Sequence, residues 1–404
     1  MATSLGFTVL HLSSSHTGGA GLSARRLSVA LNEKGINSVF LALKNAGFTP
    51  RFNEISYHRS GGMKILSKLN SLLSKILLKE TYFSLFSVPS VNVSDVIKIG
   101  DPDNTILHIH NWFNLLDTKS IKRLLSRGYH IVFTLHDQRL FTGGCHYSLH
   151  CTNYLENCAN CPFLPIGFKG LAKINRSRME TLLTSYKKQI TVIGPSSWIV
   201  EKAKSSKTLK GVEVAHLLNH HGILDKRVHA ARQIARKNRN NLVIGVASFD
   251  KNSALKGGNI ISEVQRSLKT QNSQIEIVYL ADIIDSDTKH LDFWSQIDYL
   301  LVLSVADNSP NVIHEAKYFG IPIIGSNVGG IPELLDPDND YTIESNSNQI
   351  FELESLLKSI ESSFMYIDSL SIQNSYNRLS TAHLLKLIKL YQKIDARINA
   401  KSLF

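Results

Sequence analysis

Short apolar runs alternate along the chain with stretches in which apolar residues recur at helical spacing. This alternation is typical of α/β proteins with parallel sheets, whose strands are buried on both faces and therefore read as continuous apolar runs. Six such runs in the first half predict strands at residues 6–14, 38–43, 105–110, 130–136, 190–196 and 212–218. They fit one doubly wound domain, and a helix that Gly35 closes follows the first of them.

A second α/β pattern begins after a basic helical segment at residues 224–240. Four further apolar runs predict strands at residues 241–249, 275–282, 298–304 and 321–326. Helices are expected between these strands, one at residues 261–268 and one that starts at Asn311. An amphipathic helix at residues 381–398 has no strand after it.

We therefore expect two Rossmann-like domains, at residues 1–222 and 223–380, and a C-terminal helix at residues 381–404 that crosses back to the first domain. In doubly wound sheets, ligands bind beyond the carboxyl ends of the strands. A cleft between two facing domains is the expected binding site, because small ligands usually bind in concave surfaces of this kind.

The composition is that of an ordinary globular protein, with 43% hydrophobic and 19% charged residues among 404. The formal net charge of +12 favours a polyanion, an anionic membrane face or a phosphorylated small molecule as partner, without choosing among them. The first apolar run has no basic segment before it, and no run approaches the roughly 20 residues of a membrane-spanning helix. We therefore expect a cytoplasmic protein.

All four cysteines lie in one segment, at residues 143–166, with the spacing C-x5-C-x6-C-x2-C. In a reducing compartment, clustered cysteines bind metal more often than they form disulfides. The final C-x2-C pair is a common half of a tetrahedral zinc site, and four thiolates leave no open position for a catalytic water. We predict a structural zinc held by Cys145, Cys151, Cys158 and Cys161, with His146 or His150 as a possible substitute ligand. Disulfides and free thiols are the alternatives.

The segment at residues 306–330 carries the most specific pattern in the chain. A strand ends near Ser304, and a polar turn opens a helix whose free N-terminal amides would attract an anion. Glu315 follows Asp307 after seven intervening residues, and a strand and a glycine-rich turn at residues 327–330 come next. A capped βα unit without a ligand is the plainer interpretation of the turn alone.

The order of these residues, followed by G-I-P-I-I and V-G-G-I-P-E, resembles the retaining nucleotide-sugar glycosyltransferases of glycosyltransferase family 4. The resemblance covers almost the whole chain and implies the GT-B fold of two facing Rossmann-like domains. It also implies that Glu315 holds the nucleotide ribose and that Asp307 binds hydroxyls of the donor sugar. This chain departs from the family at Asp307, where glutamate is usual. The backbone expected to meet the diphosphate or the sugar is that of Asn308, Ser309, Pro310, Asn311 and Val312.

Further stretches match the same family. Gly18 and Gly19 correspond to its glycine-rich loop, and Lys251 and Lys256 have the spacing of its basic diphosphate-binding pair, although the usual arginine is absent at position 251. His136, in TLHD, corresponds to the histidine that contacts the donor sugar. His110 and Asn111 end the strand before it and are expected on the acceptor side, or simply to pack.

The run TLHDQRLFTGGCHYSLHCTNYLENCANCP resembles an insertion found in a bacterial subgroup that builds exopolysaccharide, capsule or O-antigen chains. The resemblance implies transfer of a hexose from a nucleotide diphosphate sugar to a glycan or lipid-linked glycan, with retention at the anomeric carbon. No cofactor is expected for catalysis, because lysine and backbone amides can neutralise the leaving diphosphate. The D-P-D sequence at residues 101–103 is explained by a turn.

Two other functions fit parts of the sequence. A GT-B nucleotide-sugar epimerase would share the fold but would need further acids or bases for chemistry on the sugar ring. A basic zinc protein that binds nucleic acid would suit the net charge. The basic residues are nevertheless spread along the chain rather than placed beside the cysteines, so no nucleic-acid partner is expected.

The segment at residues 63–79 has an amphipathic helical pattern with lysines beside its apolar face. The apolar positions are Ile65, Leu66, Leu69, Leu72, Leu73, Ile76 and Leu77, and the lysines are Lys64, Lys68, Lys75 and Lys79. Such a helix lies on an anionic membrane or packs on the first domain. The first alternative would make the protein peripheral on the inner face of the cell membrane.

Overall fold

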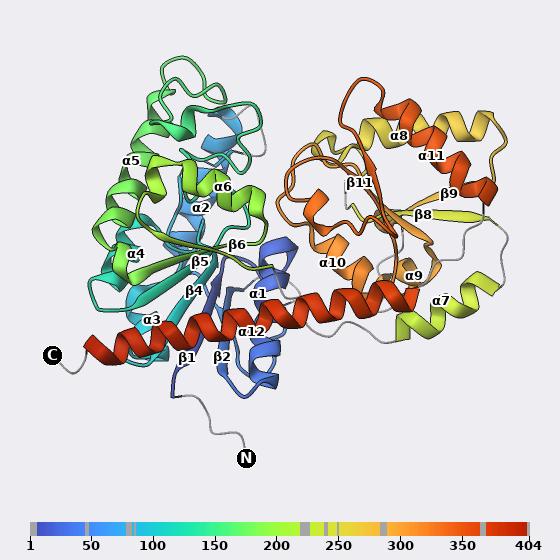
Figure 1. The fold of residues 1–404 in the computed structure, drawn as a ribbon. Helices are drawn as coiled ribbons and strands as arrows, with labels where there is room; N and C mark the ends of the chain where they lie inside the picture. Colours follow the sequence, from blue (N-terminus) through green and yellow to red (C-terminus); the bar gives the residue numbers. More distant parts are fainter. Residues whose placement is uncertain are drawn as a thin grey trace. The chain divides into compact units, whose positions relative to one another are not determined.

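The computed structural model shows a chain of alternating strands and helices in two compact units (Figure 1). It describes residues 6–44, 48–77, 83–84, 86–218, 227–237, 241–248, 250–282, 289–363 and 369–401. Unit 1 comprises Met1–Gly222 and His383–Phe404, and unit 2 comprises Ile223–Ala382. The boundary expected at residues 222 and 223 lies outside the described residues.

Unit 1 contains a seven-stranded parallel sheet in the order β3-β2-β1-β4-β5-β6-β7. Its strands are β1 (Thr8–Ser13), β2 (Asn37–Leu43), β3 (Glu54–Tyr57), β4 (Thr105–Asn111), β5 (His130–Thr134), β6 (Ile190–Gly194) and β7 (Glu213–His216). The six predicted strands are confirmed. The sequence did not predict β3, because all four of its residues are partly exposed and it pairs only with β2 at the sheet edge.

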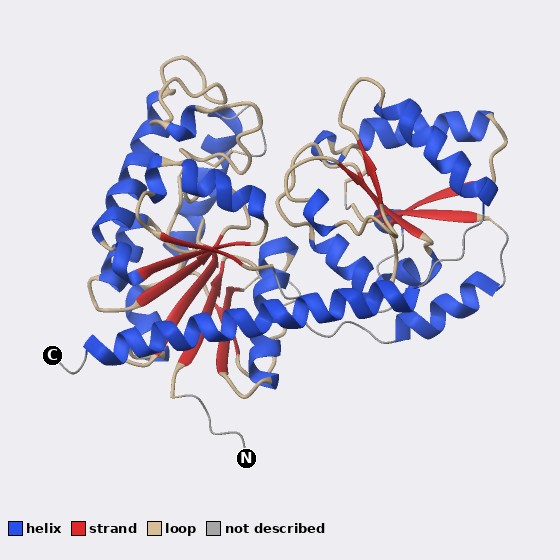
Figure 2. Ribbon diagram, in the orientation of Figure 1, coloured by secondary structure: helices blue, strands red, loops and turns tan. Residues whose placement is uncertain are grey.

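Helices lie on both faces of this sheet (Figure 2). They are α1 (Gly18–Glu33), α2 (Gly61–Leu77), α3 (Val93–Ile99), α4 (Thr118–Leu125), α5 (Gly170–Ser185) and α6 (Ser197–Ser205). The predicted end of α1 is confirmed, since Gly35 has a φ of +78° and donates its amide to the Asn32 carbonyl. The helix predicted at residues 63–79 is present through Leu77, and residues 78 and 79 lie outside the described residues.

Unit 2 contains a five-stranded parallel sheet in the order β12-β11-β10-β8-β9. Its strands are β8 (Leu242–Val246), β9 (Ile275–Tyr279), β10 (Tyr299–Val302), β11 (Ile323–Ser326) and β12 (Tyr341–Ile343). Its helices include α7 (Arg227–Lys237), α8 (Gly258–Thr270), α9 (Lys289–Gln296), α10 (Asn311–Tyr318) and α11 (Gln349–Ser363). The four predicted strands are confirmed. The sequence did not predict β12, because this strand is only three residues long.

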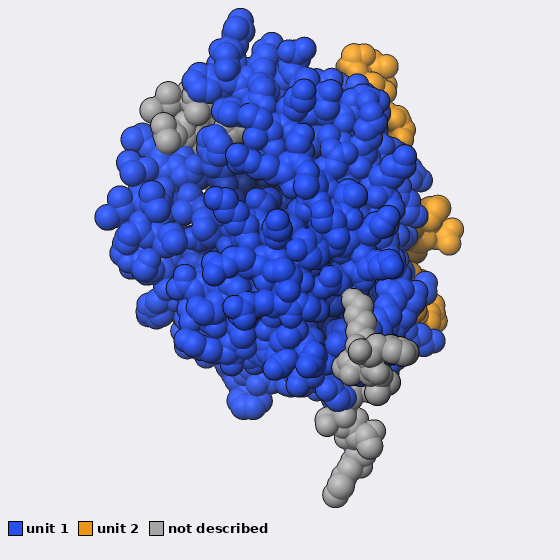
Figure 3. All heavy atoms as spheres, turned by 90° about the vertical axis from the view of Figure 1, so that its left-hand side faces the viewer, with its two compact units in different colours: residues 1–222, 383–404 blue, residues 223–382 orange. Residues whose placement is uncertain are grey.

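The last helix, α12 (Ser369–Lys401), begins 12 residues before the start predicted at residue 381. Ile372 and Tyr376, four residues apart, are buried there, so a helical face extends back into unit 2. The part from His383 onward belongs to unit 1, coloured blue with it in Figure 3, and passes across its strands β1 and β2 (Figure 1). Five buried side chains of this part pack on residues of β1, β4 and β5: Leu384, Leu387, Tyr391, Ile394 and Ile398.

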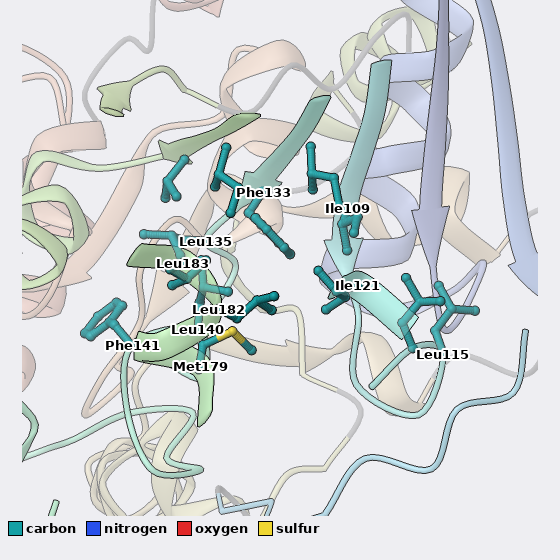
Figure 4. Packing of buried hydrophobic residues seen from close by; sticks show 14 of the residues in the cluster. Ile109, Leu115, Ile121, Phe133, Leu135, Leu140, Phe141, Met179, Leu182 and Leu183 are labelled. Carbon is teal, nitrogen blue, oxygen red and sulfur yellow. The ribbon is translucent and has the colours of Figure 1, made fainter. Parts of the chain in front are cut away.

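The larger core of unit 1 lies on the face of the sheet that α4 and α5 cover. Ile109 of β4 and Phe133 of β5 pack in one buried cluster with Ile121 of α4 and Met179 of α5 (Figure 4). Leu135, Leu140 and Phe141, which follow β5, belong to the same cluster. The segment after β5 is therefore anchored by apolar contacts at the carboxyl end of the sheet, where the predicted site residues lie.

Candidate functional site

In each sheet, the strand order reverses at one point, with later strands added to the opposite side. The reversal falls between β1 and β4 in unit 1 and between β8 and β10 in unit 2. Such switch points leave a crevice outside the carboxyl ends of the two strands, because their crossover helices lie on opposite faces. Most of the predicted site residues follow these strands.

In unit 2 the structure joins Lys256, after β8, to Asp307, after β10. The Lys256 Nζ lies 2.6 Å from Asp307 Oδ2, and Asp307 Oδ1 accepts the Asn308 amide at 2.8 Å. The Asp307 side chain is 9% exposed, whereas that of Lys256 is 47% exposed. A lysine ammonium has three donors, so Lys256 can hold Asp307 and still donate to a ligand.

The glycine-rich turn at residues 327–330 supports the Asp307 loop from behind. Gly330 donates its amide to the Asp307 carbonyl at 3.0 Å. Gly329 has a φ of +61°, and a Cβ there would lie 1.9 Å from the same carbonyl oxygen. Only glycine permits both this backbone conformation and this approach. The V-G-G sequence therefore positions Asp307 through its backbone.

Helix α10 continues from the same loop. Asn308, Ser309 and Glu315 are buried, and the Ser309 hydroxyl lies 2.7 Å from His314 Nε2. Pro310, at the N-cap position, has no polar side chain to bond the amides of the first turn. Amides at such a helix start, which in α10 include those of Asn311 and Val312, suit an anionic ligand. The structure thus places Asp307, the predicted backbone of residues 308–312 and Glu315 on one loop and one helix.

Lys251 points elsewhere. Its ammonium forms an ion pair with Asp282 and lies 4.9 Å from the centre of the Tyr279 ring, which follows from its place after β8 on the side of β9. The structure therefore brings only one of the two predicted lysines, Lys256, onto Asp307.

In unit 1, Gly18 and Gly19 are exposed at the start of α1, directly after the loop that follows β1. Ser15 Oγ accepts the Thr17 amide at 3.1 Å within this loop. Thr17, at the N-cap, makes no side-chain hydrogen bond to the helix. The two glycines thus lie where backbone amides can approach a ligand, as expected for a glycine-rich loop.

A chain of hydrogen-bonded histidines runs inward from His136. The His136 Nε2 lies 3.1 Å from His110 Nδ1, and His110 Nε2 lies 2.9 Å from His11 Nδ1. His136 is partly exposed, whereas His110 and His11 are buried. Beside them His108 is held by Tyr391 of α12 at 2.6 Å and by Thr134 at 2.7 Å. The sequence pointed to His136 and His110, and it missed His11 and His108 because buried strand residues gave no sign of polar pairing.

His11, at the inner end of this row of histidines, determines which nitrogen of each imidazole carries the proton. His11 Nε2 is buried and has no hydrogen-bond partner among the residues that the structure describes. If the N–H bonds pointed inward, this nitrogen would be a buried donor without an acceptor, which is rarer in proteins than an unpaired acceptor. We infer the opposite tautomers: His11 donates to His110, His110 donates to His136, and His136 presents its Nδ1–H outward.

Burial keeps these imidazoles neutral. It lowers the pKa of His11 to about 3 and that of His136 to about 4, from an ordinary value of 6.5. Burial also lowers the pKa of His108 and His110 well below 6.5, and the neighbouring histidines add to this effect. Near neutral pH the chain of histidines is therefore an uncharged set of hydrogen-bond donors and acceptors.

Arg139 ties together the residues around His136. Its guanidinium bonds the Asp137 carboxylate at 2.7 Å and donates to Asn111 Oδ1 at 3.2 Å. Burial alone would raise the pKa of Asp137, but Arg139 and His146 outweigh it and lower that pKa. The sequence did not single out Asp137 and Arg139, although their position directly after TLH was a usable signal. Asn111 is thus fixed in orientation at the end of β4.

The four cysteines gather in the loop between β5 and α5, and all four are free thiols. They line one cavity of about 10 Å³, the size of a single water or small ion. Burial raises the pKa of Cys145, Cys158 and Cys161, that of Cys158 to about 11. Backbone hydrogen bonds from Phe163 and Leu164 to Cys161 act in the opposite direction.

These cysteines fit zinc in kind and number. Their sulfurs are more widely spaced than in a loaded site, where Zn–S bonds of about 2.3 Å bring them close together. Among the described residues, the group of potential ligands with all donor atoms within 4.8 Å of one another is His11, His108 and His110. The nitrogens of these three are bonded to each other, to His136, to Thr134 and to Tyr391, apart from His11 Nε2, so we interpret them as a hydrogen-bonded cluster.

No protein-family model matches the chain, and no curated protein matches it. Several solved structures do match the chain over nearly its whole length. The sucrose-phosphate synthase of Thermosynechococcus elongatus is 14% identical and covers 97% of this chain and 100% of its own, with a TM-score of 0.58. Anabaena HepE in complex with UDP and glucose is 12% identical and covers 96% and 100%, with a TM-score of 0.57. The lipopolysaccharide outer core galactosyltransferase WaaB is 11% identical and covers 96% and 99%, with a TM-score of 0.53. The predicted fold class is thereby confirmed: the chain has a GT-B fold built from two Rossmann-like units.

The buried histidines should make unit 1 sensitive to acid. As the pH falls from about 6.5 toward about 4, the unfolded chain binds protons at imidazoles that the folded chain keeps neutral, so the free energy of unfolding falls. Replacing His136→Gln should reduce the loss between about pH 7 and pH 4.5 by roughly 2 kcal/mol, measured by urea unfolding. The exposed histidine His58 supplies the control, since His58→Gln should keep the wild-type loss. An unchanged loss in the His136 variant would contradict the assignment.

Proposed function

We propose that the protein is a retaining glycosyltransferase that moves a hexose from a nucleotide diphosphate sugar to a hydroxyl of a glycan or lipid-linked glycan in surface polysaccharide synthesis. The observation that carries the proposal is the Lys256–Asp307 pair at the switch point of unit 2, next to the start of α10. A cation, a buried carboxylate and helix amides in one place suit a ligand that combines a diphosphate with a sugar.

Similar structures bind the same kind of ligand. HepE was solved with UDP and glucose, and the catalytic domain of starch synthase IV from Arabidopsis thaliana, with a TM-score of 0.57, was solved with ADP and acarbose. The proposal extends this ligand class to the present chain on the strength of its own residues. Glu315 would hold the nucleotide ribose, and the backbone that meets the diphosphate is that of Asn308, Ser309, Pro310, Asn311 and Val312.

The chemistry follows from where charge develops. The bond between the anomeric carbon and the diphosphate oxygen breaks, and its electron pair leaves with the diphosphate. Lys256, the amides of α10 and the loop of Gly18 and Gly19 stabilise that charge as preorganised donors. The acceptor oxygen bonds to the same face of the carbon, and its proton passes to a diphosphate oxygen. Asp307 and the Nδ1–H of His136 hold hydroxyls of the donor sugar, and His110 and Asn111 lie on the acceptor side.

The donor site can be tested by thermal unfolding in the presence of UDP, GDP, ADP and their sugars, because a ligand of the folded state raises the unfolding temperature. One nucleoside diphosphate should stabilise the wild type, and Lys256→Gln should weaken its binding roughly tenfold to a hundredfold, the cost of a charged hydrogen bond. Lys251→Gln should cost less, since Lys251 must first leave Asp282.

Lys269→Gln is the matched control, because this lysine is exposed at the end of α8. Equal binding by the Lys256 and Lys269 variants would refute the donor site. An enzymatic product with inverted anomeric configuration by NMR would refute retention, and turnover without release of free nucleoside diphosphate would favour an epimerase.

We propose that the four cysteines hold a structural zinc that braces the loop after β5. Protein purified under reducing conditions should contain one zinc per chain by elemental analysis, and a chelator should lower its unfolding temperature. Cys161→Ser should lose the metal, whereas His150→Gln should keep it if all four ligands are sulfurs. His146 is already bonded to Ser84, with a distance of 2.8 Å. Absence of zinc from the reduced wild type would overturn the proposal.

We propose that α2 rests on an anionic membrane surface. Its residues Ile65, Leu66, Leu69 and Leu72 are 61, 53, 53 and 57% exposed, which a helix packed on the domain would not show. Lys64 and Lys68 are exposed beside them. No helix within the described ranges has the length and hydropathy needed to cross a membrane.

If α2 binds an anionic membrane, the protein should float with phosphatidylglycerol-containing vesicles in a density gradient. The double variant Leu66→Ser and Leu69→Ser should remain at the bottom, because it loses much of the apolar area that would enter the lipid. The control variant Leu370→Ser and Phe351→Ser removes two exposed apolar side chains of unit 2 and should still float. Wild-type protein that stays at the bottom would exclude the proposal.

A further inference from the structure

Unit 1 contains a groove of about 1290 Å³ that the predicted site residues do not explain. Its walls come from α4 and α5, from Ser84, Phe86 and Ser87, from the segment at residues 112–113, and from the loop at residues 139–144. Figure 3 views unit 1 from the side on which α4 and α5 lie, and the surface there is hollowed. A volume of this size exceeds that of one sugar ring and suits an extended ligand.

The groove is lined by cations. Lys119 and Lys122 of α4 and Lys173 and Arg178 of α5 are exposed, and none of them has an acidic partner in the described part of the chain. The only acidic residue among the lining residues is Asp117, which is engaged as the N-cap of α4 by the Ser120 amide. Like charges gathered in one concavity raise the local positive potential and attract an anion.

Aromatic side chains complete the wall. Phe86, Trp112, Phe113 and Tyr186 line the groove between the cations, and Arg139 stacks over Phe113 at 5.1 Å. Flat aromatic surfaces suit the apolar faces of sugar rings, and they carry polar edges for hydroxyls in the case of tryptophan and tyrosine. A groove with both features fits a saccharide that also bears negative charge.

The groove adjoins the candidate site. Trp112 and Arg139 also line the small pocket that His110, Asn111 and His136 border. At another wall Thr142 and Gly143 are shared with the cysteine-lined cavity, so the cysteine loop shapes the groove. Near Phe86 the groove adjoins α2, whose Asn70 donates to the Phe86 carbonyl at 3.1 Å.

We propose that this groove binds the acceptor as a phosphate-bearing saccharide. The phosphate lies among Lys119, Lys122, Lys173 and Arg178, and the sugar rings rest on the aromatic wall. The reacting hydroxyl points past Arg139 and Trp112 toward His136. The proposal rests on the glycosyltransferase function proposed above and names the chemical class of its acceptor. The phosphate is that of a sugar phosphate or of a lipid diphosphate, and the experiment separates the two.

Trp112 provides a local probe, since the chain has three tryptophans and only Trp112 lines the groove. Protein labelled with 5-fluorotryptophan is titrated with maltose 1-phosphate, farnesyl diphosphate and maltose, and Trp112→Phe assigns its fluorine resonance. At least one phosphate compound should shift the Trp112 resonance, with maltose binding about tenfold more weakly or not at all. A response to farnesyl diphosphate alone assigns the phosphate to a lipid carrier, and a response to maltose 1-phosphate alone assigns it to the saccharide.

The variant Lys119→Gln, Lys122→Gln, Lys173→Gln and Arg178→Gln should bind the phosphate compound about tenfold more weakly, as expected for the loss of several exposed charge pairs. A control variant removes the same charge from exposed positions outside the groove and should bind as the wild type does: Lys34→Gln, Arg127→Gln, Lys204→Gln and Lys210→Gln.

Three results would overturn the groove proposal: no shift of Trp112 with either phosphate compound, equal binding by the two variants, or tighter binding of a DNA duplex than of both phosphates. Nucleotide-dependent stabilisation of unit 2 is measured on the same samples. If no nucleotide stabilises the wild type, the proposed glycosyltransferase function is wrong. If a nucleotide stabilises the groove variant as it does the wild type, a loss of phosphate binding in that variant concerns the acceptor groove alone.

Discussion

Within each of the two sheets, every strand runs in the same direction, and this constraint arranges each unit. Parallel neighbours cannot be joined by tight turns, so most crossovers bring the chain back through a helix. All carboxyl ends consequently meet at one edge of each sheet. The loops that carry Gly18, His110 and His136 share one such edge, and those that carry Lys256 and Asp307 share the other. Pairing of the strands thus makes neighbours of residues that are dozens of positions apart in the sequence.

Hydrogen bonding decides how the buried histidines of unit 1 carry their protons. His108 bonds Tyr391 and Thr134, and the chain from His11 to His136 leaves one nitrogen unpartnered at its inner end. An unpaired polar atom is costly in a medium of low dielectric constant. The unpaired Nε2 of His11 therefore determines which nitrogen carries the proton in each histidine from His11 to His136. Tyr391 belongs to α12, so the last helix contributes a hydrogen bond to the interior as well as apolar area.

The sequence predicted those parts of the fold that depend on local pattern. The ten predicted strands are continuous apolar runs, because buried parallel strands have no polar face to interrupt them. The edge strands β3 and β12 are short and partly exposed, and they carry no such run. The start of α12 was placed too late, since its first 12 residues are mostly polar and only Ile372 and Tyr376 are buried apolar positions in that stretch.

The pairing of Lys256 with Asp307 and the groove between α4 and α5 join distant segments, and local pattern carries no information on such pairs. Lys251 illustrates the same limit, because its spacing matched the family but its partner, Asp282, lies in the turn that follows β9.

Helix α12 has a consequence for synthesis of the protein on the ribosome. Unit 1 begins near the N-terminus, yet the part of α12 that covers the apolar side chains of β1 and β4 begins only at His383. The 160 residues of unit 2, from 223 to 382, are translated in between. At about 5–20 residues per second this takes roughly 8 to 32 s. During that interval the first sheet is complete, but one of its faces lacks the segment of α12 that covers it. The nascent chain therefore exposes an apolar surface until residues 383–401 emerge.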